Sequence, residues 1–435
     1  VFLEHYFPLA FALLKQSACI GPGMAALTRC LISSLFGVTG SMYVDMAKPI
    51  VTMEEACPTT YQTNETNITK EWAKKSEGQI YEYVSNANPK MSQIPVWIFP
   101  PSLHESGPTR IIPFDLSSQL EVPYPATAPN LMASFLRIVT GEVLETGTEV
   151  ATSETFYVIR GRGSTWTPAG EVHWEAGDLL ALPFLGKLEP SCEHGQCLRH
   201  FCKEADKDGG CAMYWVHDEP LMRFLGAEPS AANRRFEPTF FREKDVLGEV
   251  GRIPQVDENG QPKNRRGVLL GNRATPQTKT LTPTLWSLLN SIKAKQTQKP
   301  HKHNSVALDF AKDGGEPGTV HTKMGRSLDV NGEIVDPISV EWKSGGVFVT
   351  PPGWWHSHHN EGNRDAWVLP VQDAGLYTHQ RTLDIRFAEE ETERLRNGIS
   401  RGATNSWEGK PVIAGTMSVG AHVRPEASDS KQAVM

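Results

Sequence analysis

Hydrophobic and polar residues alternate in many short segments of this chain. In the segment ETFYVIRGRGSTW, apolar side chains alternate around Tyr157 and Ile159 until two glycines interrupt the pattern. The segment HWEAGDLLALP combines a turn with a short apolar run that stops at Pro183, where a strand commonly ends. Segments of this kind recur about every ten residues, which predicts a small antiparallel barrel or jelly roll.

Three pairs of similar segments occur in the same order in the two halves of the chain. They are APNLMASFLRI from Ala128 and TPTLWSLLNSI from Thr282, VHWEAGDLLALP from Val172 and VEWKSGGVFVTP from Val340, and HDEPL from His217 and QDAGL from Gln372. The offsets are 154, 168 and 155 residues, and they differ only as one loop insertion would require. The chain is therefore predicted to hold two copies of one β domain.

The predicted domain organisation has six parts. They are residues 1–45, a possible targeting or extraneous segment; 46–110, an N-terminal arm with helices; 111–226, the first β domain; 227–280, a polar linker with one short helix; 281–390, the second β domain; and 391–435, a helix end and a disordered tail. The first part is apolar, but Lys15, Pro22 and Arg29 interrupt it. No run in it reaches the roughly 18 to 20 residues that a membrane-spanning helix needs. In AEEETERLRN, glutamates precede arginines, an order that the helix dipole favours.

Length, charge and cysteine content narrow the function classes. A chain of 435 residues exceeds what one hydrophobic core usually organises. The net charge of -7 includes no basic stripe or polybasic segment, so we expect neither a nucleic-acid nor a membrane partner. Seven cysteines are too few for a disulfide scaffold of this length. Cys192, Cys197 and Cys202, with His194 and His200 between them, lack a standard zinc spacing, so we expect a reduced surface loop and a cytoplasmic protein.

Histidines in the second copy are the main candidates for chemistry. In VTPPGWWHSHHNEG, His356 and His358 are two positions apart, so on a strand they face the same side. Upstream, KPHKHNSVALDF supplies His301 and His303 with the same spacing. Two strands of a barrel could direct His301, His303 and His356 at one cation. Three neutral imidazoles with open positions for substrate and oxygen suit Fe(II), with Mn, Ni, Cu or Zn as alternatives, whereas a lone histidine is more often structural.

The histidine pattern resembles a known family signature. The motif G-x5-P-x-G-x2-H, ending at Gly353 and His356, follows an H-x-H pair, as in cupins, and the duplication resembles a bicupin. More narrowly, the blocks GEVLETGTEVATSETFYVIRGRG, HWEAGDLLALP, HDEPLMRFLG, PHKHNSVAL and TPPGWWHSHHN resemble gentisate and salicylate 1,2-dioxygenases over residues 90–390. The resemblance implies an all-β fold of two tandem cupin (double-stranded β-helix, jelly-roll) barrels with a few helices. It also implies Fe(II) held by three histidines without a glutamate, and a homo-oligomer.

The first copy departs from this family. Relatives normally carry their iron in the first cupin, but here GTEVATSE stands where H-x-H belongs. Thr148 and Val150, or Gly147 and Glu149, would fill the two ligand positions. Counting from the proline that ends the preceding strand, Leu188 would fill the third. We therefore expect a metal-free first cupin and a metal site in the C-terminal one.

A second departure concerns the substrate. In relatives, an arginine that helps to hold the substrate carboxylate lies six residues after the second histidine, and here that residue is Asp309. An acid repels the carboxylate that an arginine would clamp. Basic side chains that could replace the arginine, or belong to solvated turns instead, are Arg160, Arg162, His321, Lys323 and Arg326.

The resemblance also suggests roles for residues beside the third histidine. His358 matches a family histidine near the substrate, where it could donate a hydrogen bond or move a proton; alternatively, it only supports a ligand or lies at the surface. Trp355, with Trp354, could form a wall of the catalytic pocket or pack in the core. His359 is expected to face away from the metal because side chains alternate along a strand.

The function implied by the resemblance is a non-haem Fe(II) dioxygenase that uses O2 to open the ring of a hydroxybenzoate-like or other chelating small molecule. One alternative keeps the metal as a Lewis acid in a cupin lyase, isomerase or decarboxylase. The other is a non-enzymatic storage or ligand-binding bicupin whose histidines are remnants. Cupin folds support many activities, so the fold alone does not choose among the three.

Overall fold

The structure, a computed structural model of the chain, describes residues 78–204, 210–256, 260, 263, 265–389 and 392. The possible targeting segment 1–45 lies outside the described residues, as does the predicted tail 391–435 except for residue 392. Residues up to Lys90 form a separate unit, in which α5 (Tyr83–Asn86) is described. Among the described helices, none is both long and apolar enough to span a membrane.

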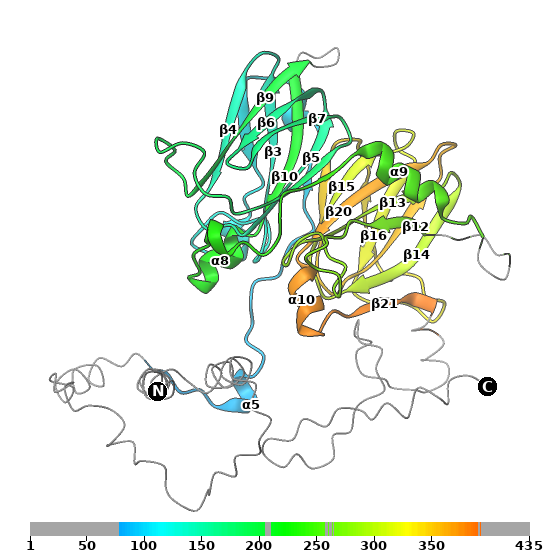
Figure 1. The fold of residues 1–435 in the computed structure, drawn as a ribbon. Helices are drawn as coiled ribbons and strands as arrows, with labels where there is room; N and C mark the ends of the chain where they lie inside the picture. The colour runs from blue at the N-terminus through cyan, green and yellow to red at the C-terminus, as the bar shows by residue number, and fades with distance from the viewer. Residues whose placement is uncertain are drawn as a thin grey trace, which may run out of the picture. The chain divides into compact units, whose positions relative to one another are not determined.

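The first barrel consists of two antiparallel sheets (Figure 1). Its six-stranded sheet has the order β11 (Thr239–Phe241), β8 (Leu179–Pro183), β5 (Ser153–Arg160), β10 (Gly210–His217), β3 (Met132–Val139) and β2 (Arg110–Pro113). Its four-stranded sheet has the order β4 (Val143–Thr148), β9 (Gln196–Glu204), β6 (Arg162–Thr167) and β7 (Gly170–Glu175). Side chains from both sheets meet in one core that includes Phe156, Trp174, Leu198 and Trp215.

The second barrel repeats this plan. Its six-stranded sheet has the order β1 (Ile98–Phe99), β18 (Val347–Thr350), β15 (Ala307–Asp313), β20 (Ala366–Gln372), β13 (Trp286–Ile292) and β12 (Arg266–Leu269). Its five-stranded sheet has the order β17 (Ile338–Glu341), β16 (Val320–Gly325), β19 (Trp355–Asn360), β14 (Gln296–His303) and β21 (Ile385–Phe387). The predicted all-β fold of two tandem jelly-roll barrels is confirmed.

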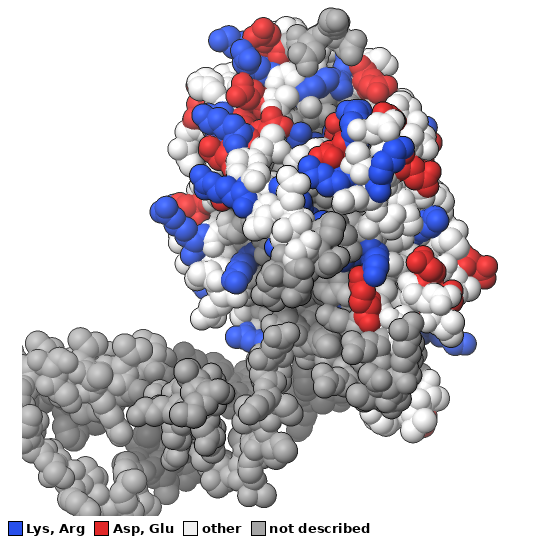
Figure 2. Space-filling model, turned by 90° about the vertical axis from the view of Figure 1, so that its right-hand side faces the viewer, with Lys and Arg blue, Asp and Glu red and all other residues white. Residues whose placement is uncertain are grey.

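Short helices connect the strands. They are α6 (Ser102–Glu105), α7 (Ser117–Leu120), α8 (Glu219–Leu225), the 3-10 helix η1 (Ala231–Asn233), α9 (Glu243–Arg252) and α10 (Ala374–Gln380). In the displayed face of the space-filling view, acidic and basic side chains are interspersed without a large area of one sign (Figure 2). Such a surface provides no concentrated field for a polyanion on that face.

The two six-stranded sheets pack against each other through a shared hydrophobic core. Phe310 of the second barrel stacks on Tyr214 of the first at 5.4 Å between ring centroids and lies 5.1 Å from Tyr157. Alternation along β5 explains this arrangement, because Phe156 faces the interior of its own barrel while Tyr157 faces the shared core. The central strands of these sheets therefore carry apolar side chains on both faces.

Two aspartates repeat across this interface. The carboxylate of Asp218 in the first barrel accepts a hydrogen bond from the hydroxyl of Thr284 in the second at 2.8 Å. Conversely, Asp373 in the second barrel accepts one from the amide of Asn130 in the first at 2.7 Å. Thr284 is 154 residues after Asn130, and Asp373 is 155 residues after Asp218. The internal repeat therefore produces a nearly two-fold symmetric contact between the barrels.

Segments outside the two repeats complete the sheets. Residues 227–280, expected to be a linker with one helix, contain α9 and also the edge strands β11 and β12. β11 pairs with β8 of the first barrel, and β12 pairs with β13 of the second. β1, from the N-terminal arm, pairs with β18 of the second barrel. Each barrel thus depends on chain that lies beyond its own repeat.

The expectation of a reduced surface loop around the clustered cysteines is wrong. Cys192, Cys197 and Cys202 are all buried, and Cys202 forms a disulfide with Cys211. Cys202 lies in β9 and Cys211 in β10, and their Cα atoms are 5.6 Å apart, within the range of a disulfide. Cys192 and Cys197 are free thiols. Together with the exposed Glu145 they lie close enough to form a possible second group of metal ligands.

The shared core predicts a large effect of truncating Phe310. We expect Phe310→Ala to lower the free energy of unfolding by about 3–5 kcal/mol, because it removes a buried ring and leaves a cavity between the barrels. Denaturant titration measures this change. Phe224→Ala is the control, since Phe224 is 75% exposed and its removal should change stability by less than about 0.5 kcal/mol. Equal stability of the two variants would contradict the shared core.

Candidate metal centre

A cavity of about 320 Å³ lies between the two sheets of the second barrel. One wall, from β14 and β19, presents Gln298, His301, His303, His356 and His358. The opposite wall, from β13, β15 and β20, presents Trp286, Leu288, Asn290, Asp309, Val368, Pro370 and Gln372. A cavity of this size, lined by both apolar and polar side chains, is suited to a small-molecule ligand.

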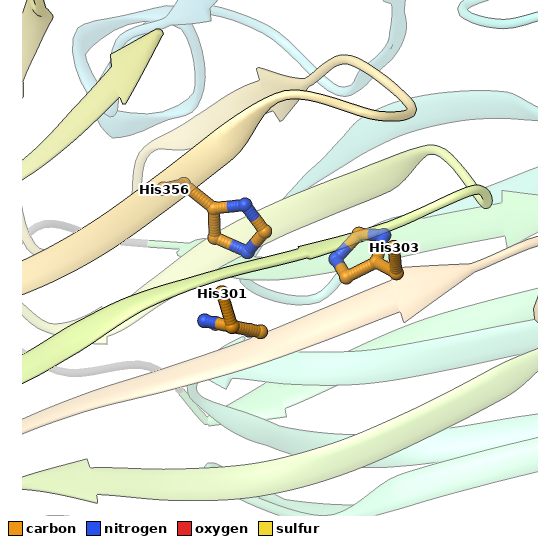
Figure 3. Close-up of side chains that lie close together, drawn as sticks. All are labelled: His301, His303 and His356. Carbon is orange, nitrogen blue, oxygen red and sulfur yellow. The ribbon is translucent and has the colours of Figure 1, made fainter. Parts of the chain in front are cut away.

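The three histidines predicted as metal ligands come together at this wall (Figure 3). One nitrogen from each of His301, His303 and His356 lies within 4.8 Å of the other two. The ring centroid of His356 is 4.1 Å from that of His301 and 4.9 Å from that of His303. His303 and His356 are buried, and His301 is half-buried.

A β-bulge allows both histidines of β14 to face the cavity. Gln298 pairs with His358 and His301 pairs with His356, so three residue steps on β14 match two on β19. On a regular strand, Gln298 and His301 would face opposite sides because side chains alternate. The extra residue lies beside Pro300, which lacks the N–H that a regular ladder would use. The bulge therefore turns the H-x-H pair inward.

Burial keeps the three imidazoles neutral. It lowers the pKa of His303 to about 4. Burial, followed by the charge of neighbouring histidines, lowers the pKa of His301 and of His356 well below the usual value. All three are therefore uncharged near pH 7, which is the form that binds metals.

Backbone carbonyls set the tautomer of two of these rings. Nδ1 of His303 donates to the carbonyl of Ser305 at 2.8 Å, and Nδ1 of His356 donates to that of Trp354 at 3.1 Å. Each ring therefore leaves Nε2 unprotonated, as metal-binding histidines commonly do. For His301, Nδ1 lies 3.4 Å from Nη2 of Arg265, which is long for a hydrogen bond.

This donor set fits a divalent transition metal. It offers three neutral nitrogens, and the group contains no carboxylate among the described residues. The ligands come from one sheet only, so the remaining coordination positions would face the cavity. An imidazole-rich, open site of this kind suits Fe(II) and related metals.

The first barrel has no nitrogen ligand at the equivalent positions. Leu198 of β9 pairs with Thr146 of β4 as His356 pairs with His301. Thr148 follows Thr146 at the same two-residue spacing. Two hydroxyls and a leucine therefore stand where the second barrel has three imidazoles.

These positions correct the alignment made from sequence. The sequence pattern predicts Thr148 and Val150 at the first two ligand positions, with Gly147 and Glu149 as the alternative, whereas the strand register places Thr146 and Thr148 there. Leu188, predicted at the third, lies in the loop before β9, and Leu198 takes its place. Leu188 was misplaced because the two barrels differ in the length of one loop. Twelve residues, 184–195, separate β8 from β9, whereas four residues, 351–354, separate β18 from β19.

His358 faces the same cavity as the three candidate ligands. Trp342 donates its Nε1 hydrogen to the hydroxyl of Thr322 at 2.7 Å, and that hydroxyl lies 2.8 Å from Nδ1 of His358. The threonine hydroxyl hydrogen can thus go to Nδ1, which leaves the imidazole proton on Nε2. Burial lowers the pKa of His358 to about 3, so the ring is neutral at pH 7. No described residue bonds to its Nε2, which is a donor available to a ligand.

The first barrel contains the same chain of groups in a closed form. Trp174 donates to the hydroxyl of Thr165 at 2.9 Å, and that hydroxyl lies 2.8 Å from Nδ1 of His200. Nε2 of His200 lies 2.9 Å from the hydroxyl of Thr146, one of the residues at a ligand position. The nitrogen that is free in His358 is therefore satisfied inside the protein in His200.

Trp355, predicted to form a pocket wall, does not line the cavity. Its buried ring lies 4.7 Å from the ammonium nitrogen of Lys302, on the other side of the sheet. Alternation explains this, because the neighbouring His356 faces inward. His359 also faces away, and its ring stacks on His321 at 4.8 Å between centroids.

The arginine nearest the histidines was missed by sequence reasoning. The basic residues proposed from sequence, which do not line the cavity, are Arg160, Arg162, His321, Lys323 and Arg326. Arg265 does line it, from the segment expected to be a linker. The signal that could have found it is the apolar run GVLL after Arg266, which forms the edge strand β12.

Arg265 is held at the edge of the cavity with one donor unused. Its Nη2 donates to the carbonyl of Lys299, and its guanidinium lies 4.8 Å from the ring centroid of Phe387. Its Nε is buried without a hydrogen-bond partner, and burial lowers the pKa of the guanidinium. A buried donor without a partner is costly, so the site favours an incoming acceptor.

Comparisons with known proteins place this geometry in context. No family model matches the chain. Gentisate 1,2-dioxygenase from Streptomyces sp is 24% identical over 179 residues, 39% of this chain and 44% of the relative. Gentisate 1,2 dioxygenase 1 from Aquipseudomonas alcaligenes is 27% identical over 146 residues, 34% and 36% of the two chains. 5-nitrosalicylic acid 1,2-dioxygenase from Bradyrhizobium sp is 29% identical over 133 residues, 29% and 53%. The matches thus span about a third to a half of these relatives.

Superposition on solved structures covers a larger part of this chain than the sequence matches do. Salicylate 1,2-dioxygenase from Pseudaminobacter salicylatoxidans superimposes with a TM-score of 0.52 at 14% identity, covering 75% of this chain and 99% of that enzyme. A mutant of that enzyme in complex with gentisate gives a TM-score of 0.51 at 14% identity, covering 78% and 99%. The sequence relatives and structural neighbours are gentisate and salicylate 1,2-dioxygenases, and this chain has their cupin fold.

Proposed function

We propose that this chain is a non-haem Fe(II) dioxygenase whose iron is held in the C-terminal barrel by His301, His303 and His356. The observation that carries the proposal is the convergence of three neutral imidazoles on one cavity. The fold shared with salicylate 1,2-dioxygenase supports it, as do the names of the sequence relatives. The threonines and leucine at the equivalent positions of the first barrel support a single iron site per chain.

The proposed substrate is an aromatic hydroxycarboxylate. Arg265 beside the histidines provides the positive charge and the unused donor that a carboxylate would accept. In relatives, an arginine at the position of Asp309 helps to hold the substrate carboxylate. Arg265 would take over this role here. Trp286, Leu288 and Val368 supply flat or aliphatic surface for the ring.

The chain's residues have distinct tasks in this proposal. Bound iron would supply the redox chemistry by which ring-cleaving dioxygenases combine O2 with their substrate. Arg265 orients the carboxylate, and the Nε2 hydrogen of His358 donates to a substrate oxygen near the histidines. With its lowered pKa, His358 acts as a neutral donor rather than as an acid at pH 7. The apolar walls exclude water from the ring.

Other predictions from the resemblance are part of the same proposal. They are O2 and a small aromatic molecule as the partners and a homo-oligomeric assembly, to which we add the cytoplasmic location and the division into domains that were predicted from the sequence itself. A Lewis-acid cupin and a storage protein are the competing functions, and the experiments below separate them from the oxygenase.

Metal content tests the proposed ligands. We expect purified protein reconstituted anaerobically with Fe(II) to bind about one iron per chain, and His301→Ala and His356→Ala to lose most of it, since removing a ligand leaves two nitrogens. The measurement is elemental analysis after gel filtration. His321→Ala is the matched control, because this histidine lies on the same sheet outside the cavity. Iron retained by both ligand variants would favour a storage protein with remnant histidines.

Oxygen consumption tests the reaction class and the role of Arg265. Iron-loaded protein should consume O2 with at least one member of a panel of hydroxybenzoates, catechols and aminophenols. Arg265→Met should raise KM for the preferred carboxylate about 10- to 100-fold, because a hydrogen bond to a charged group contributes roughly 1.5–3 kcal/mol. Arg364→Met, which breaks an exposed pair with Asp313, should leave KM unchanged. No O2 uptake with any compound would favour the Lewis-acid alternative.

The pH dependence of metal retention follows from the lowered histidine pKa values. Protons compete with a metal only near and below the pKa of a ligand, and burial lowers that of His303 to about 4. We therefore expect iron content to be constant from about pH 7.5 to pH 5 and to fall as the pH approaches 4. Anaerobic dialysis followed by metal analysis measures this. Loss of iron centred near pH 6.5 would indicate ordinary exposed histidines as ligands.

A further inference from the structure

The loop between β8 and β9 lies over the outer face of the small sheet of the first barrel. This β8–β9 loop, residues 184–195, is eight residues longer than its counterpart in the second barrel. Gly147 of β4 leaves room for it, because a Cβ there would collide with the ring of His194. Gly147 pairs with Cys197 of β9, and the next residue, Leu198, belongs to the barrel core. Cys197 therefore faces outward, toward the loop.

The loop brings a second thiol and a carboxylate together with Cys197. Cys192, in the loop, is buried, as is Cys197, and both are free thiols. Their Sγ atoms and a carboxylate oxygen of Glu145 lie within 4.8 Å of one another. Glu145 precedes Gly147 by two residues on β4, so it faces the same side, and its exposed carboxylate provides access from solvent. One loop and two strands thus contribute one group each.

These three groups suit a zinc ion. In a tetrahedral zinc site, sulfur lies about 2.3 Å and carboxylate oxygen about 2.0–2.2 Å from the metal, so the ligand atoms are roughly 3.5–3.8 Å apart. Groups that already lie within 4.8 Å of one another need only small rotations to reach this spacing. Thiolates favour zinc over Mg or Ca, which prefer oxygen ligands. The spacing in the sequence is not a standard zinc pattern because the third ligand comes from another strand.

Contacts around the three groups hold them in place and balance their charge. Nε of Arg199 donates to Glu145 at 3.2 Å, and its Nη1 donates to Glu189 of the loop at 2.7 Å. Nζ of Lys187 donates to the carbonyl of Cys192 at 2.9 Å. Two thiolates and a carboxylate carry three negative charges, of which zinc neutralises two and the guanidinium of Arg199 balances the third. The site is therefore largely formed before an ion binds.

We propose that Cys192, Cys197 and Glu145 form a zinc site that holds the β8–β9 loop against the outer face of the first barrel. The site is separate from the histidine cluster, which lies inside the second barrel, and it does not depend on the proposed dioxygenase function. In the metal-free protein, burial and the neighbouring Cys192 raise the pKa of Cys197 to about 12, so zinc binding releases the thiol protons.

The first test is binding of Co(II) and Zn(II) to metal-free, full-length wild-type protein, kept anaerobic so that its thiols stay reduced. Co(II) bound to thiolates absorbs in the near ultraviolet through sulfur-to-cobalt charge transfer, whereas Co(II) bound only to imidazoles does not. We expect this absorption to saturate at about one thiolate-bound Co(II) per chain and to disappear when Zn(II) is added, because tetrahedral thiolate sites favour zinc. His301→Ala, which removes a ligand of the other cluster, should keep the absorption.

Substitutions connect the absorption to the proposed ligands. Cys192→Ser and Cys197→Ser should each weaken Zn(II) binding by at least about 100-fold, because even the outer partners of metal ligands contribute roughly 10- to 100-fold. Glu145→Gln should weaken binding but keep the absorption, since both thiolates remain. Glu204→Gln, on the same strand as Cys197, and Cys57→Ser, which removes a thiol elsewhere in the chain, are the controls and should bind as wild type does. Circular dichroism of each metal-free variant establishes that it is folded.

The second test is cleavage by trypsin after Lys187, an exposed residue of the β8–β9 loop. Free zinc at about ten times its dissociation constant should lower the rate of cleavage about tenfold, because zinc binds only while the loop is closed. The rate, followed by mass spectrometry, should not respond to zinc in Cys192→Ser. Cleavage after the exposed Lys90, outside both barrels, is the internal control.

Three results would overturn the proposal. The first is wild-type protein that shows no sulfur-to-cobalt absorption, or that binds zinc no more tightly than both serine variants. The second is a disulfide between Cys192 and Cys197 in protein purified anaerobically, which would make the pair a redox element. The third is zinc binding that leaves the cleavage after Lys187 unchanged, which would show that the ion does not hold the loop.

Discussion

Three imidazoles can share a barrel interior only if they are uncharged and turned toward one another, and the second barrel meets both requirements. Burial lowers the pKa values of all three histidines, and the bulge in β14 brings His301 into register with His356. The carbonyls of Ser305 and Trp354 then leave two ring nitrogens free to face the cluster. Strand register, desolvation and local hydrogen bonding thus act together on one small set of atoms.

The two barrels share one hydrogen-bonded chain of side chains but differ in whether its last nitrogen is accessible to a ligand. Each contains a Trp–Thr–His chain at the same place in its sheet. In the first barrel, Thr146 completes the chain and closes it against ligands. In the second, His301 occupies the corresponding position, and the last nitrogen of the chain opens on a cavity. The first barrel therefore has a hydroxyl where the second has a candidate ligand, and this hydroxyl satisfies the buried His200.

Sequence reasoning found what periodicity and spacing encode. The repeat predicted two barrels, and the two-residue spacing of the histidines identified the side chains that meet in space. It could not foresee what depends on loop length or on contacts distant in sequence. The longer loop before β9 misplaced Leu188, and strand alternation turned Trp355 away from the cavity. Arg265 was missed because its position depends on the pairing of β12 with β13. No strand was expected in this polar segment.

The borrowed edge strands have a consequence for how the molecule can be divided. The large sheet of the second barrel ends on one side with β1 and on the other with β12, and both come from chain that precedes the second repeat. A fragment cut at the repeat boundary would leave β18 and β13 with bare hydrogen-bonding edges, which are templates for aggregation. The internal repeat therefore does not mark two separable modules, because strands from outside each repeat complete its large sheet.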